Sequence, residues 1–156
     1  MALRNIRIIG DPVLLKKSKP VTEVNEKTIE LINDMLETMY EADGVGLAAP
    51  QVGILKRIVV IDCSAEQDDP IVLINPEVVE TSGVQKGGEG CLSVPGKVGV
   101  VSRPNYAKVR ALDENMEEYE VEGEGLLARA LLHEIDHLDG ILYTTLVEGE
   151  LMDNEA

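Results

Sequence analysis

His133-Glu134-Ile135-Asp136-His137 contains the only two histidines of this 156-residue chain, four positions apart, with a glutamate directly after the first. On a helix, positions i and i+4 lie one turn apart on the same face, so both imidazoles can bind one metal ion. Glu134 lies about 100° around such a helix from His133, where it can stand beside the metal without ligating it. A carboxylate next to a metal held by two histidines is the arrangement of a metallohydrolase.

The segment around this motif is predicted to form a buried helix from about residue 125 to residue 139. Its apolar side chains recur at helical spacing on more than one face, and a helix that is apolar on most sides is expected to be buried. Gly140 is a plausible C-terminal stop. The core face consists of Leu127, Leu131, Ile135 and Leu138, and the neighbouring face of Leu126, Ala130, His133 and His137.

Upstream, a helix is predicted at about residues 25 to 42, with Asn25 as its N-cap and Gly44 as its stop. Residues 44–53, rich in glycine, alanine and proline, allow close backbone approach and are interpreted as a packed turn. Strands are predicted at 57–62, 71–75 and 76–81, and a hairpin at 107–112 and 118–122. This order predicts an α+β fold of small, mostly antiparallel sheets around a central C-terminal helix, with one N-terminal helix.

The composition predicts one globular domain that has no nucleic-acid or membrane partner. The chain is long enough to bury one core, and its formal charge of −15 opposes binding to phosphates. No apolar run approaches the ~18 residues of a membrane span, and the start lacks a secretory signal pattern. The two cysteines cannot build a disulfide framework. We therefore expect a protein of the bacterial cytoplasm, with a catalytic domain at 1–147 and a short acidic tail at 148–156.

Two histidines leave a metal site incomplete, and no histidine follows His137. Acidic residues downstream of the helix are possible third ligands, but Cys91 is the stronger candidate, because a thiolate binds zinc or ferrous iron tightly. It lies in Glu89-Gly90-Cys91-Leu92-Ser93, where glycine lets the backbone pass close to a neighbour. Taken alone, Cys91 would be interpreted as a small buried thiol. The histidine pair makes the metal-ligand interpretation preferable.

Three segments in this order resemble the signature motifs of the peptide deformylase family: Gly-Val-Gly-Leu-Ala-Ala-Pro-Gln at 44–51, Glu-Gly-Cys-Leu-Ser at 89–93, and His-Glu-Ile-Asp-His at 133–137. The resemblance extends over about residues 4 to 147. It implies an enzyme that removes the N-formyl group from the initiator methionine of new bacterial polypeptides. It also implies one divalent metal ion per chain, natively Fe2+, which Zn2+ or Ni2+ can replace.

The resemblance further implies a role for each motif residue. Cys91, His133 and His137 would be the metal ligands, and Glu134 would act as general base and then general acid. Gln51 and the backbone N–H of Leu92 would stabilise the negative charge that develops on the formyl oxygen. A side-chain amide and a backbone N–H are suitable donors for such an oxyanion.

The same resemblance implies how N-formylmethionyl peptides and nascent chains would bind. The methionine pocket is expected to be apolar, with Leu126 and Ala130 on the histidine face of the helix and Val45 beside them. The substrate backbone would pair as a strand with Val45–Gly46 and with Gly90, a form of β-augmentation.

Three departures from the family pattern stand out. Leu132 stands where relatives often have glutamine, and we expect only an indirect effect on the site. Arg129 occupies a position that is aliphatic in some relatives. At the pocket rim it would favour acidic residues beyond the methionine, and otherwise it would be a solvated side chain. Many bacterial members continue into a basic helix that docks on the ribosome, whereas residues 148–156 are acidic. We therefore expect weak or no ribosome association by that route.

Two rival functions use the same residues. A metalloendopeptidase would share Glu134 and the metal but would take its third ligand downstream of the helix. A closed structural zinc site would use Cys63 and Cys91 with both histidines, although no Cys-x-x-Cys pair supports it. Loss of the metal from Cys91→Ala would count against the endopeptidase, and loss from Cys63→Ser would favour the structural site.

Overall fold

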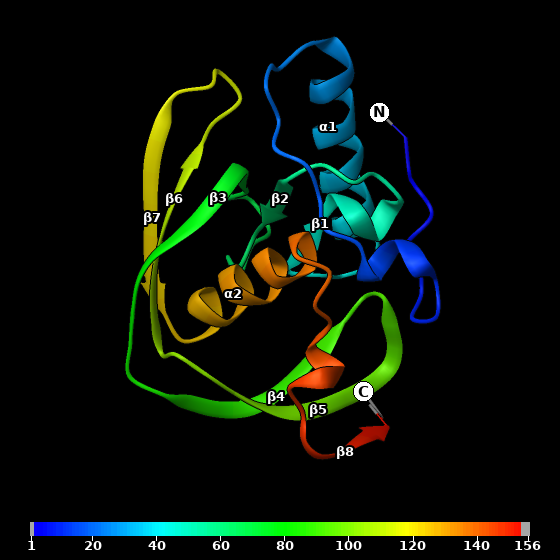
Figure 1. Ribbon diagram of the computed structural model, residues 1–156, viewed down its shortest axis with the longest axis vertical. Helices are drawn as coiled ribbons and strands as arrows, with labels where there is room; N and C mark the ends of the chain where they lie inside the picture. The colour runs from blue at the N-terminus through cyan, green and yellow to red at the C-terminus, as the bar shows by residue number, and fades with distance from the viewer. Residues whose placement is uncertain (1, 154–156) are drawn as a thin grey trace.

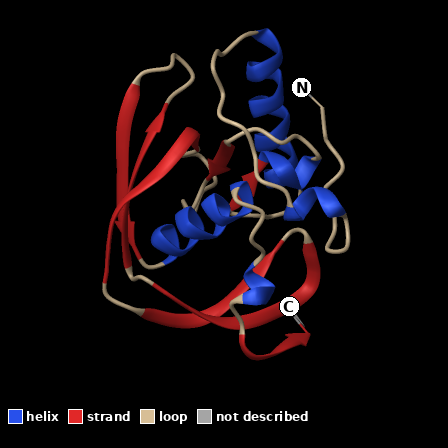
Figure 2. Cartoon of the chain, viewed as in Figure 1, coloured by secondary structure: helices blue, strands red, loops and turns tan. Residues whose placement is uncertain are grey.

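The computed structural model describes residues 2–153, which form an α+β domain with two α-helices and two antiparallel sheets (Figures 1 and 2). The helices are α1 (Glu26–Glu41) and α2 (Leu126–Leu138). One sheet has the order β1 (Gly46–Ala48), β2 (Ile58–Ile61), β3 (Ile71–Ser82), β6 (Tyr106–Leu112), β7 (Glu118–Glu124). The other has the order β4 (Gln85–Cys91), β5 (Val94–Arg103), β8 (Glu148–Asp153). The predicted fold class, with its central C-terminal helix, is confirmed.

Helix α1 begins and ends with side-chain and backbone caps. The Asn25 side chain accepts a hydrogen bond from the Thr28 N–H at 3.1 Å, and the Thr28 hydroxyl accepts one from the Asn25 N–H. At the other end, the left-handed residue is Asp43, with a φ of 56°, so the prediction of Gly44 as the stop is wrong by one residue. Aspartate tolerates this conformation better than most side chains. Gly44 is needed instead for close approach, because a Cβ there would lie 2.7 Å from Leu92 Cδ1.

Strands β1, β2 and β3 are covered by a helix on each face, α1 on one side and α2 on the other (Figure 1). Side chains that alternate along a strand point to opposite faces, and both faces are apolar here. This two-sided burial explains the unbroken apolar run Ile58–Ile61. The α1 face of these strands contains Leu47, Ile58, Val60 and Ile74. The α2 face contains Ala48, Val59, Ile61 and Leu73.

Two local predictions for this sheet are wrong. Residues 46–48, interpreted as part of a turn, form β1, which pairs antiparallel with β2. The strands predicted at 71–75 and 76–81 are one strand, β3, with a change of register between Ile74 and Glu77. Asn75 has a φ of 51° at this point. Such a bulge accommodates Pro76, which has no N–H for the ladder.

The three-stranded sheet was not predicted, and it contains most of the segment interpreted as an acidic tail. Strand β8 pairs antiparallel with β5, with Val100 opposite Glu148 and Lys97 opposite Asp153. Residues 154–156 lie outside the described part of the chain. Strand β4 is an edge of this sheet and ends at Cys91, as β1 is an edge of the larger sheet. Between residues 2 and 153, no helix has the length and apolar character to cross a membrane.

Candidate metal centre

Helix α2 and the end of β4 bring the three predicted ligands together. His133 and His137 lie one turn apart on α2, both buried, with ring centroids 5.0 Å apart. The Cys91 Sγ lies 3.3 Å from His137 Nε2, and one ligand atom from each of the three residues lies within 4.8 Å of the others. Cys63 is not part of this group, so the closed site with two cysteines is not formed.

The donor set fits a catalytic metal. One sulfur and two imidazole nitrogens would suit zinc or iron(II), and a set of three protein donors is typical of catalytic sites, whereas structural zinc sites have four. The Nδ1 of His133 is already bonded to the Glu89 carboxylate at 2.6 Å, which leaves its Nε2 for the metal. A carboxylate behind a metal-ligating histidine fixes the orientation of the ring.

Glu89 is the centre of a buried hydrogen-bond network behind the ligands. Its Oε1 accepts from Arg103 Nε at 2.9 Å and from Arg129 Nη1 at 2.8 Å. Its Oε2 accepts from Arg103 Nη2 at 2.6 Å as well as from His133. Burial would raise the pKa of Glu89, but the hydrogen bonds and charges of Arg103 and His133 hold it far below its usual range. Arg103 Nη1 also donates to Asp136 Oδ2 at 2.9 Å, so the network has a second contact with α2.

The two histidines have opposite acid–base properties. Burial, together with the positive charges of His133 and Arg103, lowers the pKa of His137 to about 3. Burial also opposes protonation of His133, but the charge of Glu134 and hydrogen bonds to Cys91 and Glu89 raise its pKa to about 10. A metal ion binds the neutral form of an imidazole, so metal binding and the protonation of this histidine pair are coupled.

Glu134 lies beside the ligands, buried, with Oε2 3.9 Å from His133 Nε2 and with no hydrogen-bond partner on Oε1. Burial is the main cause that raises its pKa to about 7. A carboxyl group with this pKa can both accept and donate a proton near neutral pH. The backbone of β1 approaches it closely, because a Cβ on Gly46 would lie 2.6 Å from Glu134 Oε2. This contact explains the glycine at position 46.

Gln51 is held in a fixed orientation next to Cys91. Its Oε1 accepts a hydrogen bond from the Ala48 N–H at 2.9 Å. Its Nε2 donates to the Ser93 hydroxyl at 3.1 Å and points to the Cys91 Sγ at 3.6 Å. Leu92 and Ser93 form the two-residue connection between β4 and β5, because Cys91 pairs with Val94. The side-chain amide and the residues after Cys91 therefore meet at one side of the candidate metal centre.

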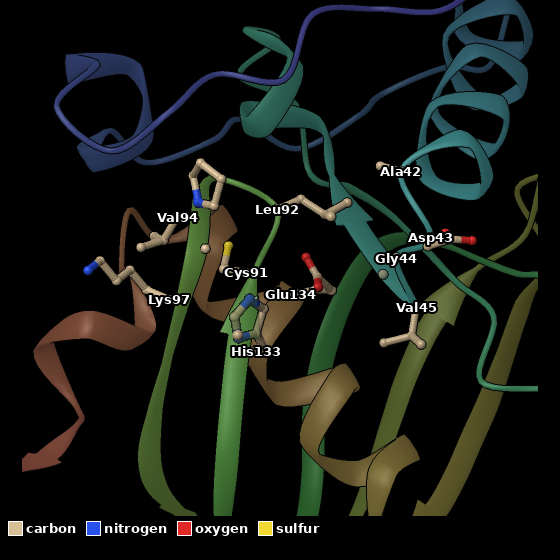
Figure 3. Close-up of a pocket in the computed structure, with 14 residues that line it drawn as sticks. Ala42, Asp43, Gly44, Val45, Cys91, Leu92, Val94, Lys97, His133 and Glu134 are labelled. Atoms are coloured by element: carbon tan, nitrogen blue, oxygen red, sulfur yellow. Dashed lines mark ion pairs between the residues drawn. The ribbon is translucent and has the colours of Figure 1, made fainter. Parts of the chain in front are cut away.

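A groove of about 480 Å³ leads to this centre, and Figure 3 shows Cys91, His133 and Glu134 at its base. Residues 42–46 form one wall and residues 94–97 lie on the opposite side. A smaller cavity of about 130 Å³ shares Val45, Gly90, His133 and Glu134 with the groove. Among the residues predicted to bind substrate, Gly46 lines the groove, and Leu126, Arg129 and Ala130 line the smaller cavity.

Arg129 is 8% exposed, so its interpretation as a solvated side chain is wrong. Sequence reasoning also gave no role to Glu89, Arg103 or Ser93. Glu89 lies within one of the quoted motifs, and a carboxylate often supports a metal-ligating histidine, so this residue could have been considered as a support for His133. Arg103 carries no comparable signal, because its contacts join segments that are distant in the sequence.

Comparison with known proteins identifies the family. The model of the polypeptide deformylase family matches residues 3–150. A peptide deformylase from Lachnoclostridium phytofermentans is 66% identical over 151 residues, which cover 97% of this chain and 93% of the relative. The crystal structure of a peptide deformylase from Legionella pneumophila superposes with a TM-score of 0.91 at 46% identity, covering 94% of this chain and 86% of that one.

A second solved structure, a peptide deformylase from Synechococcus elongatus in complex with actinonin, gives a TM-score of 0.89 at 43% identity and covers 94% of this chain and 79% of that one. The family match spans the five-stranded sheet, both helices, strands β4 and β5, and every residue of the candidate centre. On the evidence of motifs, fold and relatives, this chain belongs to the polypeptide deformylase family.

Proposed function

We propose that this protein is a peptide deformylase, a metal-dependent hydrolase that removes the formyl group from the N-terminal formylmethionine of newly made polypeptides and releases formate. The observation that carries this proposal is the meeting of Cys91, His133 and His137, with Cys91, His133 and Glu134 at the base of an open groove. A structural metal site would be closed, whereas this one has a carboxylate and an entry path for a peptide.

Cys91, His133 and His137 would hold one divalent metal ion, Fe2+ natively, with Zn2+ or Ni2+ as alternatives. When bound, the ion would supply Lewis acidity, which makes water more acidic and polarises a carbonyl group. Glu89 would orient His133 through the 2.6 Å hydrogen bond to Nδ1.

Glu134 would move the proton in both halves of the reaction. Its carboxylate would accept a proton from the attacking water and then donate it to the departing amine nitrogen. A neutral amine leaves more easily than an amide anion, so this second transfer is needed for the C–N bond to break. The position of Glu134 beside the ligands and its pKa near 7 support this role.

Gln51 and the backbone N–H of Leu92 would stabilise the negative charge that develops on the formyl oxygen. Each such donor is typically worth about 3 kcal/mol in the transition state. The fixed orientation of the Gln51 amide supports this role, because Ala48 and Ser93 hold it before the substrate arrives. A donor held in place in advance requires no reorganisation during the reaction.

The peptide would bind as a strand between the edges of the two sheets, with backbone contacts to Val45–Gly46 on one side and to Gly90 on the other. The free edges of β1 and β4 support this arrangement. The methionine side chain would enter the smaller cavity, where Leu126 and Ala130 are apolar neighbours of Val45. We place the enzyme in the bacterial cytoplasm, with formylmethionyl peptides and nascent chains as substrates and without membrane or nucleic-acid binding.

The test is formate release from formyl-Met-Ala-Ser by protein loaded with iron(II) under anaerobic conditions. Glu134→Gln is the matched control, since it keeps the size of the side chain and removes the base. We expect formate from the wild-type protein and a loss of at least about 100-fold in kcat for the variant. Full activity of Glu134→Gln would exclude Glu134 as the base, and no formate from the wild-type protein would refute deformylation.

A further inference from the structure

The smaller cavity has an unusual lining for an apolar pocket. Its volume of about 130 Å³ is well below the ~300–1,000 Å³ of pockets for drug-sized ligands, so it has room for a single side chain. Two charged residues, Glu89 and Arg129, border it in addition to Glu134. The remaining lining residues are Val45, Gly88, Gly90, Leu126, Ala130 and His133.

The guanidinium of Arg129 is held by acceptors of the protein itself. Each of its three nitrogens has an acceptor: Nη1 binds Glu89 at 2.8 Å, Nη2 binds the Val101 carbonyl at 3.1 Å, and Nε binds Gln85 Oε1 at 3.3 Å. Of these acceptors, only Glu89 borders the cavity. An arginine whose head is bound in this way presents mainly its hydrocarbon stem to the remaining space. A charged residue can therefore form part of an apolar wall.

The neighbouring strand leaves space that Arg129 occupies. Positions 87 and 88 of β4 are both glycine, and a Cβ built on Gly87 would lie 3.7 Å from Arg129 Nη2, in van der Waals contact. No side chain from these two positions can therefore close the cavity. The guanidinium lies directly beyond the space that a Cβ on Gly87 would fill, and Arg129 as a residue is only 8% exposed. Arg129 on α2 therefore lines the cavity next to the two positions of β4 that contribute no side chain.

We propose that Arg129 is a specificity-determining residue that sets the depth of this cavity and so the length of the first side chain that the enzyme accepts. This inference rests on the proposed deformylation and adds a residue that limits it. Because the guanidinium is bound to Glu89, Gln85 and Val101, Arg129 provides no free charge for acidic residues of a peptide. The preference for acidic residues considered from the sequence does not follow from this geometry.

The experiment compares kcat/KM for two substrates, formyl-Met-Ala-Ser and its ethionine analogue, which is longer by one methylene at the end of the side chain. One methylene too many in a closed apolar pocket costs roughly 10–200-fold in kcat/KM. The wild-type protein should therefore prefer methionine by about tenfold or more. Arg129→Ala and Arg129→Gln, which both shorten the side chain, should reduce this preference at least about fivefold.

Two control variants distinguish a change in the depth of the cavity from a general loss of stability or activity. Arg129→Lys keeps a long stem and a charge, and it should retain the wild-type preference within about twofold. Arg110→Ala removes a half-exposed arginine that pairs with Glu118 on the larger sheet, and it should leave the preference unchanged. A loss of stability alone would lower activity on both substrates equally, so the ratio is insensitive to it.

Three results would contradict the inference. Equal use of both substrates by the wild-type protein would show that no floor limits the pocket. An unchanged preference in either shortened variant would show that Arg129 does not form the floor. Absence of formate from both substrates with the wild-type protein would refute the proposed function itself, and with it this inference.

Discussion

Replacing Glu89 with glutamine would test whether the network behind the ligands stabilises the fold. Its side chain is 4% exposed, and its two oxygens accept four hydrogen bonds from two arginines and one histidine. Glutamine has nearly the same volume, but it removes the charge and turns an amide NH2 towards groups that are themselves donors. The variant therefore leaves Arg103 and Arg129 buried without their shared anion.

The expected cost can be worked out from this geometry. Removing one partner from a buried ion pair destabilises a protein by about 3–5 kcal/mol. In a domain of about this size, each kcal/mol shifts the melting temperature by roughly 2–4 °C. The melting temperature of Glu89→Gln should thus fall by about 6–20 °C. Thermal unfolding followed by circular dichroism, with and without added metal, measures this shift.

The effect of Glu89→Gln on the melting temperature should also depend on pH. The folded-state pKa of Glu89 lies far below its ordinary value of 4.5, so the carboxylate contributes full stability above that value. This contribution to stability is lost as the pH falls through the folded-state pKa. The difference in melting temperature between the wild-type protein and Glu89→Gln should therefore shrink over the same pH range. Glu118→Gln, an exposed partner of Arg110, should melt like the wild-type protein. A melting temperature of Glu89→Gln within about 2 °C of wild type would refute the reasoning.

Three further predictions concern other parts of the molecule. Gly46→Ala places a Cβ 2.6 Å from Glu134 Oε2, so kcat should fall at least tenfold while the circular dichroism spectrum is retained; an unaffected kcat would show that Glu134 can move freely. Cys91→Ala should weaken zinc binding at least tenfold in equilibrium dialysis, and unchanged binding would favour the endopeptidase with a downstream ligand. Hydrogen bonds from Ser64 and Tyr40 outweigh burial and lower the pKa of Asp62, so its stabilisation is present above its ordinary value of 3.8 and lost as the pH falls through the folded value. Below a pH of about 4, the melting temperature of Asp62→Asn should therefore fall less steeply with decreasing pH than that of the wild-type protein. The same pH dependence in both proteins would contradict this.

The sequence was most informative where local patterns decide the structure. Helix α2 follows from its apolar periodicity and its glycine stop at 140, and the i, i+4 spacing places His133 and His137 on one face. The buried strand β2 follows from its run of β-branched residues. These features depend on neighbours in the chain, so a single sequence contains them.

The remaining features depend on contacts between distant segments. Strand β4 contains three glycines among its seven residues, and nothing local identifies it as a strand; its pairing with β5 does. Strand β8 is acidic and exposed, and only its register with β5 defines it. The meeting of Arg103 with Glu89 likewise requires the folded sheet. The incomplete histidine pair and the ligand chemistry of a thiolate pointed to Cys91 before the family resemblance and the structure did, but no periodicity in the sequence joined the three residues.

The central claim is that this protein removes a formyl group and does not cut within chains. The most direct measurement is mass spectrometry of the products from one formylated peptide of about ten residues that begins with methionine. The peptide is incubated with the anaerobically iron-loaded protein, with Glu134→Gln as control. We predict a single product, the full-length peptide with a free amino terminus, together with one equivalent of formate. Internal fragments from a peptide that keeps its formyl group would contradict the account.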